Sequence, residues 1–368
     1  MRILFVGDEA VFPATLVELV AELGQDWEVE RCEDAGGAMA RVAAQPLDVI
    51  LVAPTLPDMP PATLLGQVRT LRAEASRVAV IDGDQNPPAR IIGLAHRFLP
   101  APLAPEVLLE AIGSLEELRE LLDNPVLRER IGRVEQLPSP PQLYLRLMNA
   151  LETDEDTSAS DIARLVAGDP AIAAKVLQLC NSAYFSNGRT IADLRAAVTR
   201  LGISTLRDLV LASEVFSLPG ASGVDRAALQ QRALLASRLA KRMLPESSAE
   251  LGATAALLAD IGLLLPGVRD EREAAVEGDA RPGHAEAGAY LLGLWGLPMP
   301  IIEAVAFHRS PSRSSTRSFW VTGAVHTAMA LAAGEEPDEA YLTRTGVVSR
   351  LGDWRGYAEA LNATPLAA

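Results

Sequence analysis

Ser160-Asp161-Ile162-Ala163-Arg164-Leu165-Val166-Ala167-Gly168-Asp169-Pro170 is the stretch that decides the fold of the second half of this chain. Asp169 and Pro170 predict a helix start, because an Asp side chain accepts amide hydrogens of the first turn and Pro has no amide hydrogen to leave unbonded. Ser160 predicts the cap of the preceding helix, and Gly168 predicts its end. We therefore expect a helix, a tight corner and a second helix.

The residues after this corner continue a helical pattern. Ile172, Val176, Leu177 and Cys180 recur at three- and four-residue spacing, which predicts an amphipathic helix with one face toward a core. No strand signal follows, so this half of the chain is expected to be all-α. Further helices are expected at residues 193–200, 204–216, 226–243, 249–265, 284–294 and 300–307, near 319–333 and in the tail.

The first 118 residues follow a different pattern. Short apolar runs at 2–6, 49–52 and 78–81 alternate with helical stretches such as 15–23 and 36–44. This alternation predicts an α/β fold, a doubly wound parallel sheet of five strands. Function in such a sheet gathers at the carboxyl ends of the strands. That edge carries Gly7-Asp8-Glu9, Ala53-Pro54, Asp82-Gly83 and Ala101-Pro102.

A helical connector joins the two halves. The helix that begins at Pro105 is expected to break at Asn124-Pro125, because proline removes a backbone hydrogen bond and restricts the residue before it. The chain thus divides into a domain at 1–118, a connector at 119–136 and a domain at 137–368. We expect the connector to serve as a packed joint; the alternative is that it transmits a change in the pairing of the first domain.

Composition and charge limit the classes of partner and the cellular compartment that are expected. The net charge of -15 argues against a nucleic acid or an anionic membrane as partner, since binding phosphates requires clustered Lys and Arg. Cys32 and Cys180, the two cysteines, have no metal-type spacing and are expected to be buried, reduced thiols. The early acids Asp8 and Glu9 do not fit a signal peptide, and Asp260 interrupts the longest apolar run. A cytoplasmic protein is expected.

The second domain resembles the HDOD domain, a helical module related to the HD phosphohydrolases. The resemblance rests on four motifs in order and spacing: Leu137-Pro138-Ser139-Pro140-Pro141, Asp169-Pro170, Asn181-Ser182-Ala183-Tyr184-Phe185 and Leu201-Gly202. Asn181 and Ser182 are interpreted as a hydrogen-bonded helix end, with a ligand contact as the alternative.

The first domain resembles the receiver domain of response regulators. That family places two acids after its first strand, a phosphoacceptor aspartate after the third, a hydroxyl residue after the fourth and a lysine after the fifth. Those positions hold Gly7, Asp8, Ala53, Asp82 and Ala101. Alanine supplies neither a nucleophile nor a cation for phosphoryl transfer, so the resemblance implies a pseudo-receiver whose vestigial acid is Asp8. Such a domain is expected to act in docking or dimerisation.

One further acid follows the third strand of that domain. Asp58 could be imagined as a substitute phosphoacceptor, but we interpret it as a solvated loop acid.

The candidate chemical site of the second domain is Asp260, His284 and His308, with His326 as a fourth candidate. Histidine nitrogens and a carboxylate are suitable ligands for zinc, manganese or iron, and three of them with an open position suffice for metal-assisted hydrolysis. Their spacing of about 24 residues places them on separate helices, so their convergence is a hypothesis.

The resemblance to HD phosphohydrolases weighs against catalysis. The family's paired histidine is replaced by Ala259, and its earlier histidine falls near Arg232. Arg309 holds the second place of a later histidine pair, and Met329 stands where a late aspartate is expected. These losses imply that Asp260, His284 and His308 form a vestigial cleft without catalytic residues.

The predicted function is a non-catalytic bacterial signal-transduction regulator of the two-component type, with no cofactor. A phosphorylation-incompetent receiver would be coupled to an HDOD output domain that binds signalling proteins or a ligand. A homodimer through the receiver or the connector is an expected assembly. Two alternatives remain: a phosphohydrolase with a divalent metal at Asp260, His284 and His308, and a nucleotide second-messenger sensor whose phosphates contact Arg232 and Arg309.

Overall fold

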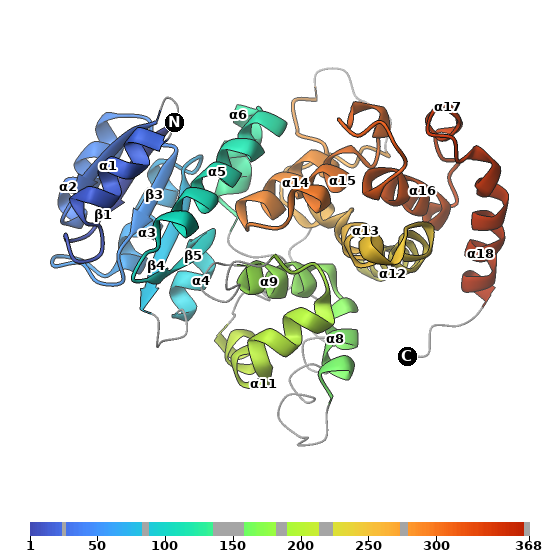
Figure 1. Ribbon diagram of the computed structural model, residues 1–368, viewed down its shortest axis with the longest axis horizontal. Helices are drawn as coiled ribbons and strands as arrows, with labels where there is room; N and C mark the ends of the chain where they lie inside the picture. Colours follow the sequence, from blue (N-terminus) through green and yellow to red (C-terminus); the bar gives the residue numbers. More distant parts are fainter. Residues whose placement is uncertain are drawn as a thin grey trace.

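The computed structural model describes residues 1–23, 27–82, 88–134, 158–181, 190–212, 224–272 and 279–363. The predicted motifs at 137–141 and 182–185 and the end of the helix expected at 204–216 lie outside these residues. A sheet with its covering helices forms one end of the molecule, and the all-helical part forms the other (Figure 1).

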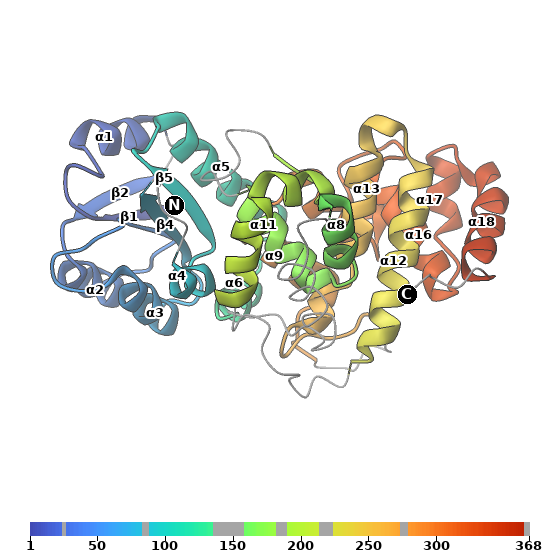
Figure 2. The same ribbon diagram turned by 90° about the horizontal axis from the view of Figure 1, so that it is seen from below.

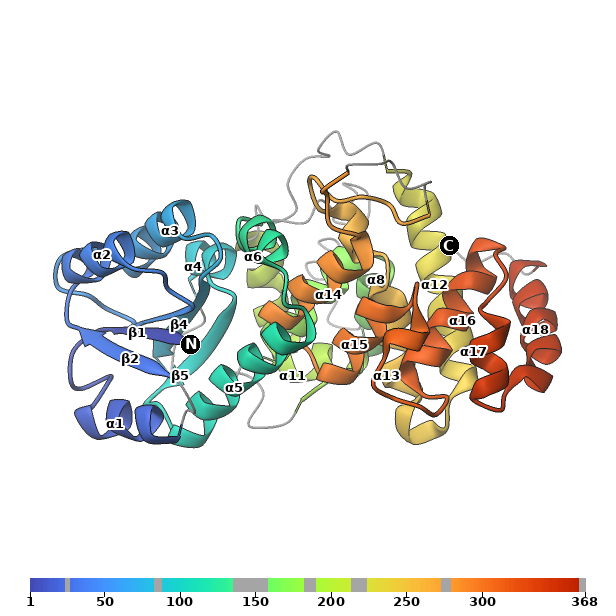
Figure 3. The ribbon, with the colours of Figure 1, turned by 90° about the horizontal axis from the view of Figure 1, so that it is seen from above.

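Five parallel strands in the order β2-β1-β3-β4-β5 form the sheet. Their bounds are β1 Arg2–Val6, β2 Glu28–Cys32, β3 Val49–Val52, β4 Ser76–Asp82 and β5 Arg97–Ala101. Helices α1 Ala14–Leu23 and α5 Pro105–Leu121 cover one face, and α2 Ala35–Ala44, α3 Pro61–Leu71 and α4 Ala89–Leu94 cover the other (Figure 3). The predicted doubly wound sheet is confirmed, and its strand order is the flavodoxin-like one.

Asp58 is exposed in the loop after β3. Its carboxylate accepts hydrogen bonds from the amides of Ala35 and Gly36, both at 2.9 Å, at the start of α2. These bonds lower the pKa of Asp58. Asp58 is thus an exposed loop acid, as predicted, and in addition its side chain ties the loop after β3 to the amino end of α2.

The connector breaks where proline predicts. Helix α5 ends at Leu121, and α6 runs over Pro125–Gly132. The side chain of Asn124 accepts hydrogen bonds from the amides of Val126 and Leu127 and so caps α6. Both helices pack against α14 (His284–Leu294), and Figure 3 shows them between the sheet and the helical part.

The opening unit of the helical part has a different cap from the one predicted. Helix α8 (Ala159–Ala167) is capped by Ser158, whose hydroxyl oxygen accepts a hydrogen bond from the amide of Asp161 at 3.2 Å. The prediction of a Ser160 cap was wrong, because Ser158 is the residue three positions before Asp161, the spacing of a capping arrangement. The corner that follows is confirmed, since Asp169 accepts hydrogen bonds from the first turn of α9 (Pro170–Asn181).

Helix α9 is not amphipathic. Every residue from Pro170 to Cys180 is buried, polar Lys175 and Gln178 included. The helix contacts β5, α8, α11 and α13, so it has no face left for solvent (Figure 2). The apolar residues recur at helical spacing, as predicted, but small alanines fill the intervening positions and allow close packing on all sides.

The remaining helices follow the predicted pattern closely. Those expected at 226–243 and 284–294 are confirmed as α12 and α14, whereas the one expected at 249–265 begins earlier and ends at Leu258, before a separate 3-10 turn. Residues 194–212 form one stretch broken at Gly202, whose φ of 75° only glycine adopts readily. In the described helical part, one isolated bridge between Arg269 and Gly283 is the sole β-type pairing. The bounds are α11 Leu194–Ala212, α12 Arg226–Met243, α13 Glu246–Leu258, η1 Ile261–Leu264, α15 Met299–Phe307, η2 Pro311–Arg313, α16 Val321–Ala333, α17 Glu339–Arg344, η3 Val348–Arg350 and α18 Leu351–Ala363.

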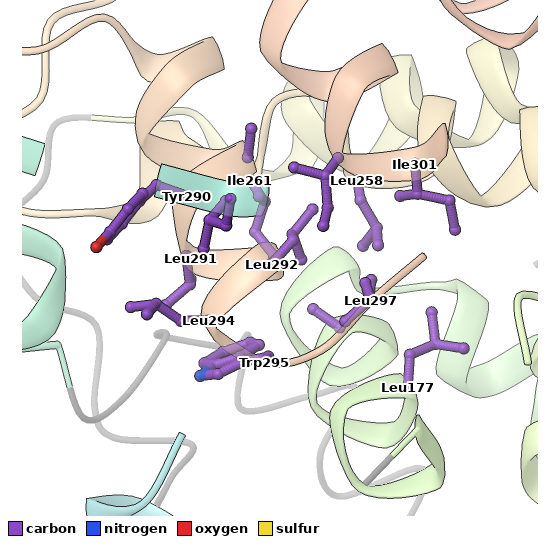
Figure 4. Packing of buried hydrophobic residues seen from close by; sticks show 14 of the residues in the cluster. Leu177, Leu258, Ile261, Tyr290, Leu291, Leu292, Leu294, Trp295, Leu297 and Ile301 are labelled. Carbon is purple, nitrogen blue, oxygen red and sulfur yellow. The ribbon is translucent and has the colours of Figure 1, made fainter. Parts of the chain in front are cut away.

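One hydrophobic core runs through both parts of the molecule. Its buried residues extend from the sheet through α5 and α6 to α9, α13 and α14. Leu177 of α9 and Trp295, just after α14, are two of its buried residues (Figure 4). The stretch Glu246–Leu264 is long and apolar enough to cross a membrane, but 78% of it is buried inside the protein, which is the environment of a core helix.

Candidate functional site

Small residues pack against each other at the carboxyl edge of the sheet. Ala53 follows β3 and is 1% exposed. Opposite it, a Cβ atom added to Gly7 would lie only 2.5 Å from the Cβ of Ala53. Asp8 accepts a hydrogen bond from the amide of Val11 at 3.1 Å and is exposed. The two positions at which the family carries carboxylates, Gly7 and Ala53, are thus filled by direct packing of small residues.

The structure brings Asp260, His284 and His308 together. Asp260 lies between α13 and η1, His284 begins α14, and His308 follows α15. One ligand atom from each residue lies within 4.8 Å of the other two, and all three side chains are buried (4%, 0% and 1% exposed). The Oδ1 atom of Asp260 lies 3.3 Å from Nε2 of His284 and 3.7 Å from Nε2 of His308. The hypothesis of convergence is confirmed in geometry.

Two arginines occupy the other side of the same carboxylate. Arg232 of α12 places Nη2 2.6 Å and Nε 2.8 Å from Oδ2 of Asp260. Arg272 places Nη1 3.6 Å from the same oxygen and holds Asp270 with its remaining nitrogens. Burial would raise the pKa of Asp260, but its interactions with His284 and His308 outweigh burial and hold that pKa well below its usual range. Asp260 is therefore a charged carboxylate.

Hydrogen bonds to the backbone indicate the tautomer of each histidine of the cluster. The amide of Glu271 donates to Nδ1 of His284 at 3.1 Å, so a neutral His284 carries its proton on Nε2, facing Asp260. In His308 the arrangement is reversed, because Nδ1 lies 2.8 Å from the carbonyl of Val305 and must donate to it. The Nε2 atom of His308 is buried and has no hydrogen-bond partner among the described residues.

His326 belongs to a neighbouring structural network. Its Nδ1 donates to the carbonyl of His308 at 2.7 Å, and its Nε2 accepts from the amide of Asp338 at 2.8 Å. Burial is the main cause that lowers the pKa of His326. Both ring nitrogens are used to join the end of α15 to the start of α17, so His326 is not part of the Asp260 cluster.

A shallow cavity of about 300 Å³ opens beside the cluster. Arg232, Arg272 and Glu335 contribute its charged lining. Arg309, predicted as a phosphate contact, pairs with Glu335 at 2.7 Å. Met329 is buried in α16.

Sequence reasoning missed Arg272 and its neighbours. The run Asp270-Glu271-Arg272 carries three charges ten residues after Asp260, and this density was the available signal. Glu271 also places Oε2 3.3 Å from Nδ1 of His284 and accepts a hydrogen bond from the amide of Ala285. The loop after η1 thus supplies the second layer of contacts around His284.

Comparison with known proteins matches part of the chain to a known family. The family model of the HDOD domain matches residues 137–311. A curated protein of Treponema pallidum (strain Nichols), described as an uncharacterized protein, is 27% identical over 200 residues, which make up 48% of this chain and 38% of that protein. The chain thus spans well under half the length of this relative.

Two solved structures are similar in shape. The MmoQ response regulator of Methylococcus capsulatus is 23% identical with a TM-score of 0.46, over 59% of this chain and 97% of that one. A virulence factor of Campylobacter jejuni is 16% identical with a TM-score of 0.50, over 66% of this chain and 98% of that one, which shows a shared fold.

The sheet and the family match together define the class. The protein consists of a five-stranded parallel sheet with its covering helices, followed by a helical part that carries an HDOD domain.

Proposed function

We propose that this protein is a non-catalytic signalling regulator in which a phosphorylation-incompetent receiver-like domain is coupled to an HDOD domain that binds a protein partner. The observation that carries the proposal is the ion pair between Arg232 and Asp260. In an HD-type centre this carboxylate would serve a metal, whereas here its charge is already balanced by a guanidinium. The replacement of the phosphoacceptor by the buried Ala53 supports the same conclusion for the first domain.

The acidic surface fits a protein partner better than a nucleic acid. A chain with a net charge of -15 repels phosphate backbones, and the two arginines nearest the cavity already contact carboxylates. These pairs leave little free positive charge to attract a nucleotide. For that reason we favour the binding of a protein partner over nucleotide sensing at Arg232 and Arg309.

A second candidate is a single metal ion at Asp260, His284 and His308, and the unpartnered Nε2 atom of His308 is the observation that favours it. Binding by Nε2 of His284 would require the loss of the proton that this nitrogen carries, because Nδ1 of His284 accepts a hydrogen bond from the amide of Glu271. The lone pair of His308 Nε2 lies 3.7 Å from Oδ1 of the Asp260 carboxylate. A proton or a cation between these two atoms would relieve their repulsion. A tetrahedral zinc site places ligand atoms about 3.4 Å apart, close to the spacing here. Such an ion would act as a Lewis acid. A two-metal centre does not fit, because Ala259 stands where the paired histidine belongs.

Metal content decides between the two candidates. Full-length protein purified without chelators is analysed for transition metals, beside a variant that combines Asp260→Ala with His284→Ala. The proposal predicts a substoichiometric metal content in both proteins and no hydrolysis of a phosphodiester substrate. One metal per chain that disappears in the variant would replace the proposal by the metal-site candidate.

Phosphorylation is tested separately on the first domain. Incubation with a small phosphoryl donor and Mg²⁺ is expected to leave the mass of the intact protein unchanged, because Ala53 offers no nucleophile. An added phosphate mapped to residues 1–118 would overturn this half of the proposal.

A further inference from the structure

A buried arginine joins the sheet to the HDOD domain. Arg97 lies on β5 and is 8% exposed. Its Nη2 donates to the carbonyl of Gly293 at 2.8 Å and its Nε to that of Leu294 at 3.2 Å, the last residues of α14. Its Nη1 donates to the carbonyl of Ala111 on α5 at 2.7 Å. One guanidinium thus holds the carboxyl end of α14 against β5 and α5.

The opposite end of α14 enters the Asp260 cluster. His284 is the first residue of the helix, and its Nε2 lies 3.3 Å from Asp260. The helix contains 11 residues, so its two ends are about 16 Å apart. No loop or hinge intervenes between the residue that contacts Asp260 and the carbonyls that Arg97 grips.

Glycines allow close packing at both ends of α14. At the sheet end, a Cβ atom on Gly293 would lie 2.4 Å from a methyl carbon of Leu118 in α5. At the cluster end, a Cβ atom on Gly262 would lie 1.9 Å from the carbonyl oxygen of His284. Backbones packed this closely transmit displacement, because the interior has little free volume to absorb it.

We propose that α14 is a mechanical relay through which the docking state of the receiver-like domain sets the position of His284 against Asp260. The inference rests on the proposed function only in assigning the input to docking of a partner on the first domain. A shift of β5 or α5 moves the carbonyls held by Arg97, the helix follows as a rigid body, and the contact between His284 and the carboxylate changes. The geometry of the Asp260 cluster is then coupled to the position of the sheet through α14, over about 16 Å.

The chain is well suited to a direct test, because its four histidines are all described by the structure: His96, His284, His308 and His326. Full-length protein with ¹⁵N-labelled histidine is studied by NMR as wild type and as Gly293→Ala. The added methyl group presses on Leu118 and displaces the sheet end of α14. The matched control is Gly113→Ala in α5, where a Cβ atom would meet nothing within 4 Å.

The relay predicts that Gly293→Ala shifts the ring-nitrogen signals of His284 and that Gly113→Ala leaves them in place. Because rotation of Leu118 could accommodate the methyl group, Arg97→Gln serves as a second variant that removes the grip itself. Unchanged His284 signals in both Gly293→Ala and Arg97→Gln would overturn the proposal. The readout needs neither metal nor partner, so a failure of the relay is distinguishable from a failure of the proposed function.

Discussion

The guanidinium of Arg232 lies 2.6 Å from the carboxylate of Asp260, and the Asp260 side chain is 4% exposed. Arg232 is near the position where the related phosphohydrolases carry a histidine, and it reaches the carboxylate that would otherwise serve a metal. This cation balances the buried charge of Asp260. The ion pair governs the first two predictions.

Arg232→His is expected to increase zinc affinity. The substitution removes the competing cation from Asp260 and adds an imidazole ligand beside His284 and His308. Isothermal titration with zinc should show at least a tenfold lower dissociation constant than wild type. Arg238→His on the exposed face of α12 is the control, and an equal gain in both variants would mean that the added histidine binds zinc nonspecifically.

Asp260→Asn is expected to destabilise the protein by about 3 kcal/mol, because it leaves the partly buried Arg232 without its counter-charge. The measurement is the free energy of unfolding from urea denaturation. Glu129→Gln, which removes an exposed pair with Arg133, should have a far smaller effect. Similar losses in the two variants would show that the Asp260 pair contributes no more than a surface contact.

Lys175 gives the protein a pH-dependent stability. Its ammonium lies 4.9 Å from the centroid of the Trp295 ring, and burial lowers its pKa from 10.5 to about 7. Between pH 7 and 9 the unfolded chain therefore holds more protons on this lysine than the folded protein does. Stability consequently rises with pH across this window, with a slope of up to about 1.4 kcal/mol per pH unit.

Lys175→Met should remove the rise of stability with pH. Lys241 is the second lysine of the chain and is exposed, so Lys241→Met should retain this rise. Urea denaturation at pH 7, 8 and 9 measures both slopes. A slope that survives in Lys175→Met would assign the pH dependence to another group.

Asp58→Ala is expected to lower the urea midpoint of unfolding, because two amides at the start of α2 lose their acceptor. Asp58→Asn should retain part of the stability, since an amide oxygen can replace one of the two acceptors. A midpoint that stays at the wild-type value in Asp58→Ala would show that Asp34, which caps Gly37, suffices alone.

Local chemistry predicted much of the fold. Asp169-Pro170 and Asn124-Pro125 placed helix boundaries correctly, because capping and proline sterics act within a few residues. The Ser160 cap was missed by two positions because both serines can accept the same type of hydrogen bond. The burial of α9 on every side could not be foreseen, since periodicity describes one helix and not the elements that surround it.

The site was only partly predictable for a related reason. Asp260, His284 and His308 could be named because few residues carry metal-type ligands. Their convergence, and the approach of Arg272, depend on how α12 to α15 pack, which spacing alone does not specify. Arg77 and Arg97 lie inside buried strands, and such charges predict a buried partner without saying which carbonyls it will be.

The grip of Arg97 on α14 also bears on how this protein can be divided. A fragment that contained the helical part alone would lose the donors to Gly293 and Leu294 and would expose the apolar surface that α5 and α6 now cover. In the first domain alone, the guanidinium of Arg97 would lose the two carbonyl acceptors on α14 and keep those on α5. The boundary expected from the sequence thus cuts through the shared core, and we expect the two domains to unfold together.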